Sequence, residues 1–343
     1  MNNRKDVKNF TLEEFEKELE NISEPDYRAR QIFSWIYKRL AGDFSAMDNI
    51  PKPLREKLAQ SYYIGAITPL KHLKSRDRTE KVLFRLEDGN LIESVLIYAG
   101  RRVTLCISTQ AGCKFACLFC ASGMNGFKRN LAVSEILSQI ISLERNLKYK
   151  ITNYVFMGMG EPLDNYENVS KAIKIMNSKY GMGIAARRIT VSTSGLVPGI
   201  EKFKGLGLQV NLSISLHAIN NELRDKLMPI NKKYPLDKVL KACEDYVDNG
   251  GRMLTFEYVL IKGTNDAEKD IDGLVKIAKR LKAKINLIPY SPIPGVNFQA
   301  PMEKDVKTFE DRLLKRGINV TVRESKGRDI MAACGQLAGT QTT

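Results

Sequence analysis

Hydrophobic residues recur at helical spacing in three stretches near the N-terminus. The stretches are FTLEEFEKELENI (10–22), EPDYRARQIFSWIYKRLAG (24–42) and PKPLREKLAQSY (51–62), and each predicts an amphipathic helix. Two apolar-rich runs then flank Asp88-Gly89-Asn90 within residues 81–98, which predicts a β-hairpin. We therefore expect a small helical module over residues 1–80, followed by a linking hairpin over 81–98.

From about residue 100 onward, apolar strand-like runs alternate with amphipathic helical stretches. This alternation predicts a parallel sheet covered by helices. The predicted strands span 103–109, 153–158, 188–193, 209–215, 254–260, 284–289 and 318–323, and the predicted helices span 134–147, 165–179, 236–250, 267–281 and 303–317. Six or seven such units without a GxGxxG turn favour a barrel, open or closed, over a dinucleotide-binding sheet. The expected fold class is α/β, with a partial (βα)6-type TIM barrel over 99–330 and a C-terminal segment over 331–343.

The composition is that of a globular protein with a strongly basic balance. The chain has 343 residues, 43% of them hydrophobic, and a formal net charge of +15. Residues 101–150 alone hold eight basic and two acidic side chains. Such a surface attracts nucleic acid through counterion release, although a merely solvated basic face has the same composition. The sequence has neither an apolar run long enough to span a membrane nor the apolar core of a signal peptide, so we expect a cytoplasmic protein without membrane contact.

Three of the six cysteines form a C-x3-C-x2-C motif, Cys113, Cys117 and Cys120, directly after the first predicted barrel strand. Clustered thiols in a cytosolic chain bind metal or perform chemistry more often than they form structural disulfides. Structural zinc needs four ligands, and the motif supplies three. A [4Fe–4S] cluster held by three cysteines fits better, because it leaves one iron open to a substrate.

Five further blocks accompany this motif along the chain: MGMGEPL (157–163), STSG (192–195), SLHA (215–218), MPIN (228–231) and AACGQL (332–337). Together and in this order they resemble the RlmN/Cfr family of radical S-adenosylmethionine (radical SAM) RNA methyltransferases. The resemblance covers nearly the whole chain, including the helical module at its start. It implies a radical SAM core barrel preceded by an RNA-binding accessory domain.

The resemblance also implies a set of cofactor-binding residues. Cys113, Cys117 and Cys120 would hold a [4Fe–4S] cluster, and its open iron would bind the amino and carboxylate groups of S-adenosylmethionine (SAM). Ser291 lies in the segment 285–295 at a position where the family usually has asparagine, and a hydroxyl can also donate and accept there. The residues that correspond to SAM contacts are Gly160, Glu161, Ser192, Ser215, Leu216, His217 and Ser291.

Two cysteines and a glutamate receive catalytic roles by the same resemblance. The C2 atom of adenine is electron-poor and does not attack the methyl group of SAM, so a thiolate takes the methyl group first. Cys334 corresponds to this S-methylcysteine, Glu93 to the proton acceptor, and Cys106 to the thiol that resolves a covalent RNA adduct by forming a disulfide with Cys334. The resemblance further implies that two SAM molecules are used per turnover. Taken singly, each of the three also fits an ordinary strand or turn position.

The implied activity is methylation of adenine C2 in 23S rRNA (adenosine 2503, in the peptidyl transferase centre) and in tRNA (adenosine 37). The implied partners are these two RNAs and an electron donor such as flavodoxin or ferredoxin, and we expect a monomer. Two alternatives stay open. One is the C8-adenine methyltransferase of the Cfr antibiotic-resistance branch. The other is a zinc-stabilised RNA-binding protein without catalysis.

Overall fold

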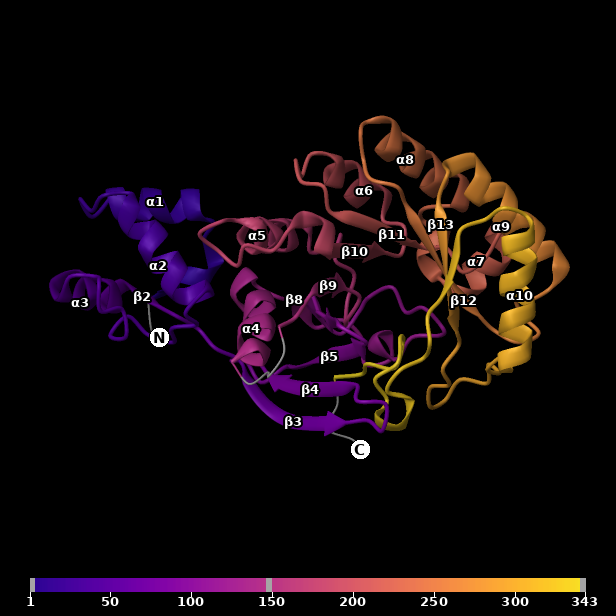
Figure 1. The fold of residues 1–343 in the computed structure, drawn as a ribbon, viewed down its shortest axis with the longest axis horizontal. Helices are drawn as coiled ribbons and strands as arrows, with labels where there is room; N and C mark the ends of the chain where they lie inside the picture. Colours follow the sequence, from indigo (N-terminus) through magenta and orange to yellow (C-terminus); the bar gives the residue numbers. More distant parts are fainter. Residues whose placement is uncertain (1–3, 146–149, 340–343) are drawn as a thin grey trace.

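The computed structural model describes residues 4–145 and 150–339 and is built around one ten-stranded mixed sheet (Figure 1). Its order is β14-β13-β12-β11-β10-β9-β6-β5-β4-β3, and the seven strands from β14 to β6 are parallel. Both β14 and β3 are edges, so the barrel is open. The strands are β3 (Thr68–Lys74), β4 (Glu80–Arg85), β5 (Leu91–Ala99), β6 (Arg102–Cys106), β9 (Asn153–Phe156), β10 (Ile189–Thr193), β11 (Asn211–Ser215), β12 (Thr255–Leu260), β13 (Lys284–Pro289) and β14 (Val320–Val322). Two short pairs, β1 (Lys5–Asp6) with β2 (Tyr62–Tyr63) and β7 (Gln110–Ala111) with β8 (Arg129–Asn130), complete the sheet structure.

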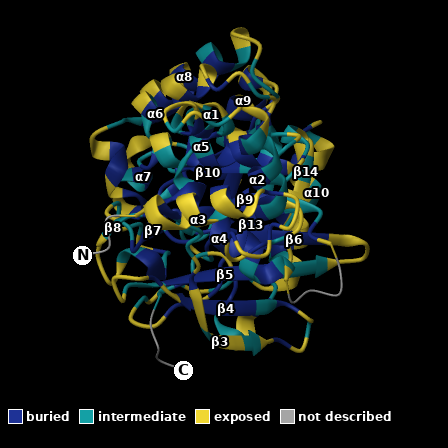
Figure 2. Ribbon diagram, turned by 90° about the vertical axis from the view of Figure 1, so that its left-hand side faces the viewer, coloured by how far each residue is buried: buried dark blue, intermediate teal, exposed yellow. Residues whose placement is uncertain are grey.

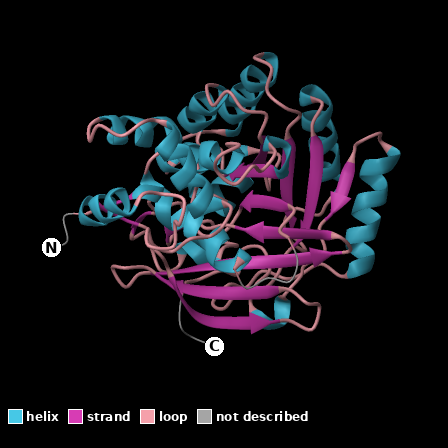
Figure 3. Cartoon of the chain, turned by 60° about the vertical axis from the view of Figure 1, so that its left-hand side comes forward, coloured by secondary structure: helices cyan, strands magenta, loops and turns pink. Residues whose placement is uncertain are grey.

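Helices lie against the outer face of the parallel strands, while the first three helices form a separate group at one end (Figures 1 and 3). They are α1 (Leu12–Glu20), α2 (Tyr27–Tyr37), α3 (Lys52–Ser61), α4 (Val133–Glu144), α5 (Tyr166–Asn177), α6 (Val197–Lys204), α7 (Asn221–Leu227), α8 (Leu236–Asp248), α9 (Glu268–Leu281) and α10 (Glu303–Lys315). Alternate strand residues such as Leu212, Ile214 and Phe256 are almost completely buried beneath these helices. Burial of this apolar face drives the sheet and helices together.

The expected α/β architecture is confirmed. All seven predicted barrel strands and all five predicted barrel helices are present, and α6 and α7 are two short helices that the pattern did not predict. The hairpin is also present as β4 and β5, but it does not stand apart from the barrel. Its second strand pairs with β6, and β3 pairs with its first strand, so the predicted linker is a continuous part of the sheet.

The N-terminal helices are fixed to the barrel by polar contacts with α4 and α5. Thr11 caps α1, and Glu14 completes a capping box with it. The same Glu14 carboxylate accepts a bond from Lys171 on α5 at 2.6 Å, and the Ser134 amide at the start of α4 donates to Asn9 at 2.9 Å. The buried faces of these helices therefore continue into the barrel core (Figure 2).

Three sequence predictions reach residues outside the described ranges. These are the first three positions of the module over 1–80, the last two positions of the predicted helix 134–147 and the end of the segment 331–343. Within residues 4–145 and 150–339, no helix combines the length and the apolar character needed to cross a membrane.

Candidate active site

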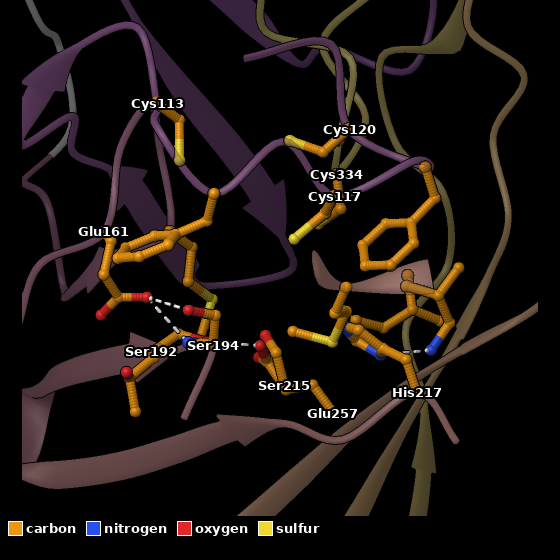
Figure 4. Close-up of a pocket in the computed structure, with 18 of the residues that line it drawn as sticks. Cys113, Cys117, Cys120, Glu161, Ser192, Ser194, Ser215, His217, Glu257 and Cys334 are labelled. Atoms are coloured by element: carbon orange, nitrogen blue, oxygen red, sulfur yellow. Dashed lines mark hydrogen bonds between the residues drawn. The ribbon is translucent and has the colours of Figure 1, made fainter. Parts of the chain in front are cut away.

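A cavity of about 150 Å³ lies at the C-terminal ends of the parallel strands (Figure 4). Cys113, Cys117 and Cys120 line it from the loop after β6, and Cys334 lines it from the other end of the chain. Barrel enzymes carry their chemistry at this end of the strands. The sequence placed the motif on this loop, whereas the approach of Cys334 depends on the tertiary fold.

The loop that carries the three cysteines is held by backbone bonds to distant segments. The Leu118 amide donates to the Leu227 carbonyl at 3.0 Å, and the Ala121 amide donates to the Gly335 carbonyl at 2.6 Å. Gly335 has a φ of +84°, and a Cβ atom there would lie 2.7 Å from the Phe119 carbonyl oxygen. Glycine at this position thus lets the segment with Cys334 pack directly on the loop.

The donor set suits a multi-iron cluster better than one metal ion. Among the described residues, no three His, Cys, Asp or Glu side chains gather around a single point as one ion requires. An iron–sulfur cluster instead takes each thiolate at a separate iron, so its ligands stand further apart. Burial raises the pKa of Cys113 to about 12, and it also raises the pKa of Cys117, with the neighbouring thiols adding to the shift. Without metal these thiols are protonated, so binding a cluster would release protons.

Glu161 is a buried carboxylate at the edge of the cavity, and its contacts join two strand ends. Its Oε2 atom accepts bonds from the amide and the hydroxyl of Ser194 at 2.7 and 2.8 Å, and its Oε1 atom accepts from the Leu163 amide at 3.0 Å. Burial raises the pKa of this carboxyl, opposed by these hydrogen bonds. Gly160, with a φ of +95°, packs against the side chain of Gln110, which a Cβ atom there would meet at 2.4 Å.

Three further predicted residues line the cavity from the ends of β10 and β11: Ser192, Ser215 and His217. The His217 ring accepts a bond from the Val259 amide through Nδ1 at 3.0 Å, and burial lowers its pKa to about 3. The ring is therefore neutral at physiological pH. Its backbone has a φ of +58°, a costly conformation for a non-glycine residue and one that is common at functional sites.

Four predicted residues do not line this cavity. The Leu216 side chain is buried in the main apolar core, and Ser291 is also buried away from the cavity lining. Glu93 lies buried on β5, where it pairs with Lys81 at 2.9 Å and accepts bonds from the Ala338 and Gly339 amides. It thus contacts the C-terminal segment a few residues beyond Cys334. Glu93 is therefore not an ordinary solvent-facing strand residue, because its side chain is almost wholly enclosed.

The fourth of these residues, Cys106, is buried at the end of β6. Burial raises the pKa of its thiol to about 12, and the nearby Cys334 raises it further, so the two sulfur atoms lie within electrostatic reach of each other. Cys334 is exposed toward the cavity. Enclosure by the surrounding protein also raises the pKa of the Cys334 thiol, and the positive charge of Arg323 opposes the upward shift at both thiols.

Two site residues had no motif that would single them out. Glu257 on β12 lines the cavity and accepts a bond from the Ser192 hydroxyl at 2.6 Å. Arg224 on α7 is fully buried, and its guanidinium donates to the carbonyls of Ser194, Ser215 and Leu216 at 2.7, 3.0 and 3.1 Å. It thereby fixes the backbone at the ends of both strands that line the cavity. The only sequence signal for it is its place four residues before the MPIN block.

Comparisons with known proteins match both parts of this architecture. A sequence model of the radical SAM superfamily matches residues 107–275, and one of the ribosomal RNA large subunit methyltransferase N-terminal domain matches residues 5–64. The chain is 44% identical, over 334 residues and 97% of both chains, to a Clostridium novyi (strain NT) protein named probable dual-specificity RNA methyltransferase RlmN. A protein of the same name from Thermoanaerobacter sp. (strain X514) is 47% identical over 332 residues, which cover 96% of this chain and 97% of that one.

This chain belongs to the RlmN family of radical SAM methyltransferases. A crystal structure of a radical SAM methyltransferase from Sphaerobacter thermophilus agrees with it at a TM-score of 0.92 and 44% identity, covering 98% of this chain and 100% of that one. Membership in the RlmN family makes the chain an enzyme and implies SAM and an iron–sulfur cluster as cofactors. In this chain, the three thiols of the C-x3-C-x2-C loop line one cavity and fit the ligands of such a cluster.

Proposed function

We propose that the protein methylates C2 of adenine in 23S rRNA and in tRNA, at adenosines 2503 and 37, through an S-methylcysteine intermediate on Cys334. The observation that carries this proposal is the shared cavity. Cys334 reaches the same cavity as the three cysteines of the loop, although it comes from the opposite end of the chain. A structural cysteine would have no reason to be exposed there, whereas a methyl carrier must be.

In this proposal Cys113, Cys117 and Cys120 hold a [4Fe–4S] cluster. With SAM bound, that cluster supplies an organic radical able to remove a hydrogen atom from a methyl group. Gly160, Glu161, Ser192, Ser215 and His217 would bind SAM at the cavity wall, and the buried Leu216 and Ser291 would contribute through their backbone groups. The polar groups are fixed before SAM arrives, because each is tied to a neighbouring strand end.

Cys334 would act first, as the thiolate that attacks the methyl group of one SAM and displaces S-adenosylhomocysteine. After the methyl carbon has bonded to the adenine ring, a base must remove the ring proton. The Cys106 thiolate would then attack the Cys334 sulfur, so that the S–S bond forms while the bond from this sulfur to the RNA-linked carbon breaks. That carbon takes up a proton, which leaves the methylated RNA. The electrostatic contact between these two thiols supports this pairing.

Glu93 is proposed as the base that accepts the ring proton. Its place beside the C-terminal segment supports a role near Cys334. Its pairing with Lys81 and two backbone amides also means that the carboxylate must leave some of these partners to reach a substrate. Movement of the segment around Ala338 would release the carboxylate from its two amide partners.

The remaining parts of the proposal concern partners and organisation. Residues 1–80 would form the RNA-binding accessory domain, supported by the match over residues 5–64 and by cation–aromatic pairs such as Arg39 over Trp35, at 4.2 Å. The core barrel would span 99–330 and the catalytic-cysteine segment 331–343. A monomeric cytoplasmic enzyme would take electrons from flavodoxin or ferredoxin and use two SAM molecules per turnover.

Mass spectrometry of modified nucleosides from 23S rRNA and bulk tRNA, with and without the gene, tests this function. Loss of 2-methyladenosine from both RNAs is the expected result, and loss from one RNA would restrict the substrate. Disappearance of 8-methyladenosine instead would point to the C8 branch, and no change in either nucleoside would refute the proposed substrate. In the purified enzyme, Cys334→Ala should abolish methylation, while Cys106→Ala should accumulate protein joined covalently to RNA on a denaturing gel.

Metal content tests the cluster separately from the substrate. An anaerobic preparation should contain about four irons and four sulfides per chain, as expected for a [4Fe–4S] cluster. Changing Cys113, Cys117 or Cys120 to alanine should remove most of this iron. Cys243→Ala is the matched control, because this cysteine is buried on α8, away from the cavity lining, and its loss should leave the iron content unchanged. One zinc per chain would support the non-catalytic alternative.

A further inference from the structure

The inner face of the open barrel is polar, in contrast to the closely packed aliphatic interior of a closed TIM barrel. Every second residue of the central strands faces inward, and the strand register sets these residues side by side. One row runs through Ser192, Ser213, Thr255 and Lys284 on β10 to β13. The next runs through Ser215, Glu257, Asn286 and Thr321 on β11 to β14. With these two rows of polar side chains, the inner face of strands β10 to β14 differs from the aliphatic interior of a closed barrel.

A second cavity of about 240 Å³ occupies this polar interior, below the cavity that holds the cysteines. Arg252, Lys284 and Arg323 are among its lining residues, and no described acidic residue lines it. Lys284 is the first residue of β13 and Arg252 shortly precedes β12, so both lie at the N-terminal ends of the strands. The Arg252 Nε atom donates to Asn211 at 2.9 Å, which holds the guanidinium at this mouth.

The two cavities meet at one point. Met157 and Arg323 line both of them, and Arg323 donates to the Met157 sulfur at 3.2 Å. Above the cysteines, the C-terminal segment packs on the cysteine loop: the Ser122 hydroxyl and the Asn125 amide donate to the carbonyls of Leu337 and Ala338 at 2.7 and 3.0 Å. The second cavity thus gives a polar approach toward Cys334 from the N-terminal ends of the strands.

We propose that this second cavity is the binding channel for the nucleotide that is methylated, with Arg252 and Lys284 at its mouth binding RNA phosphates. The ligand class is a single-stranded RNA segment with one purine turned out of its stack. Arg323 faces the Glu257 carboxylate at 3.8 Å, whereas the Arg252 guanidinium bonds to a neutral amide and neither Arg252 nor Lys284 forms an ion pair with any described residue. Two such cations suit a phosphate backbone, and the rows of hydroxyl and amide groups can bond to ribose and base edges. This inference rests on the proposed function and adds the route and the contact residues.

The test measures the affinity of the full-length enzyme, reconstituted with its cluster, for a fluorescein-labelled RNA stem-loop with an adenosine in its loop. Arg252→Ala/Lys284→Ala should weaken binding about tenfold for each phosphate bond that it removes. It should also reduce the slope of log K against log salt by roughly 1.4, since each contact to a single strand contributes roughly 0.7. Lys238→Ala/Lys276→Ala removes two exposed helical lysines outside the channel and should leave both quantities unchanged.

Two further variants separate a binding role from a structural one. Arg252→Lys/Lys284→Arg keeps both charges and should restore most of the affinity. Thr190→Leu narrows the second cavity from a position whose register partners, Val155 and Asn211, do not line the first cavity. It should lower kcat/KM for RNA at least tenfold while SAM affinity stays at the wild-type value. An alanine pair that binds RNA with wild-type affinity and salt slope overturns the channel. So does a charge-keeping pair that is as weak as the alanine pair. If wild-type enzyme itself neither binds nor methylates the stem-loop, the proposed function fails instead.

Discussion

Replacement of the buried Arg224 gives the sharpest test of how the active-site wall is held. Its guanidinium donates to three backbone carbonyls at the ends of β10 and β11 and, at 2.7 Å, to the Asn231 side chain. Burial lowers the pKa of Arg224 to about 10, so the group is still charged at neutral pH. Arg224→Ala leaves the three carbonyls buried and without these partners.

The expected loss follows from the number of acceptors. Each buried carbonyl left unsatisfied costs about 1–2 kcal/mol, so three should destabilise the fold by about 3–6 kcal/mol. For a chain of this length the entropy of unfolding near the midpoint is about 0.7 kcal/mol/K, so the thermal midpoint should fall by about 4–8 °C. The strand ends also lose their fixed positions, so SAM affinity should fall in the fraction that remains folded.

The matched control is Arg280→Ala, which breaks a surface pair with Glu244 in which the arginine side chain is half exposed. Such pairs contribute about 0–1 kcal/mol, so the midpoint should move by less than about 2 °C. Differential scanning fluorimetry and equilibrium dialysis of SAM measure the two effects under anaerobic conditions. Equal midpoints for the two variants, or unchanged SAM affinity in Arg224→Ala, would refute the positioning role.

Three other predictions concern pH, backbone and a buried ion pair. The pKa of His217 is lowered to about 3 in the folded state, whereas in the unfolded chain the ring binds a proton near pH 6.5, so the free energy of unfolding should fall as the pH drops. Between pH 7.5 and 5.5 His217 should account for about 1.4 kcal/mol of this decrease, and urea unfolding of His217→Gln should lack that part. Gly335→Ala and Gly89→Ala place alanine at similar φ values of +84° and +86°, but only Gly335→Ala brings a Cβ atom within 2.7 Å of the Phe119 carbonyl oxygen. Methylation should therefore fall at least tenfold for Gly335→Ala alone, and equal activities of the two variants would contradict the packing argument. Lys81→Ala removes the ion-pair partner of the buried Glu93 carboxylate, so the free energy of unfolding should fall by about 3–5 kcal/mol. A decrease below about 1 kcal/mol in a urea titration would show that the pair is dispensable for stability.

Local sequence patterns determined most of the secondary structure. The spacing of apolar residues located the barrel strands and five of its helices, because burial of one face imposes a period of two or 3.6 residues wherever an element packs. The short helices α6 and α7 gave no such signal, since about two turns hold too few positions to reveal a period. The C-x3-C-x2-C loop was also visible, because its three ligands are neighbours in the sequence.

Tertiary structure decided which distant residues share a site. Cys334 joins the loop cysteines, Glu93 meets Lys81 and the C-terminal segment, and Arg224 reaches two strand ends. Each of these contacts joins elements that are far apart in the sequence. Each therefore depends on strand order and helix packing, and the spacing of apolar residues does not reveal it. The resemblance to a known family supplied roles for Cys334 and Glu93, but it supplied neither their surroundings nor the polar barrel interior. The sequence by itself determined the elements and the cysteine motif, and only the packing of the open sheet determined the cavities between them.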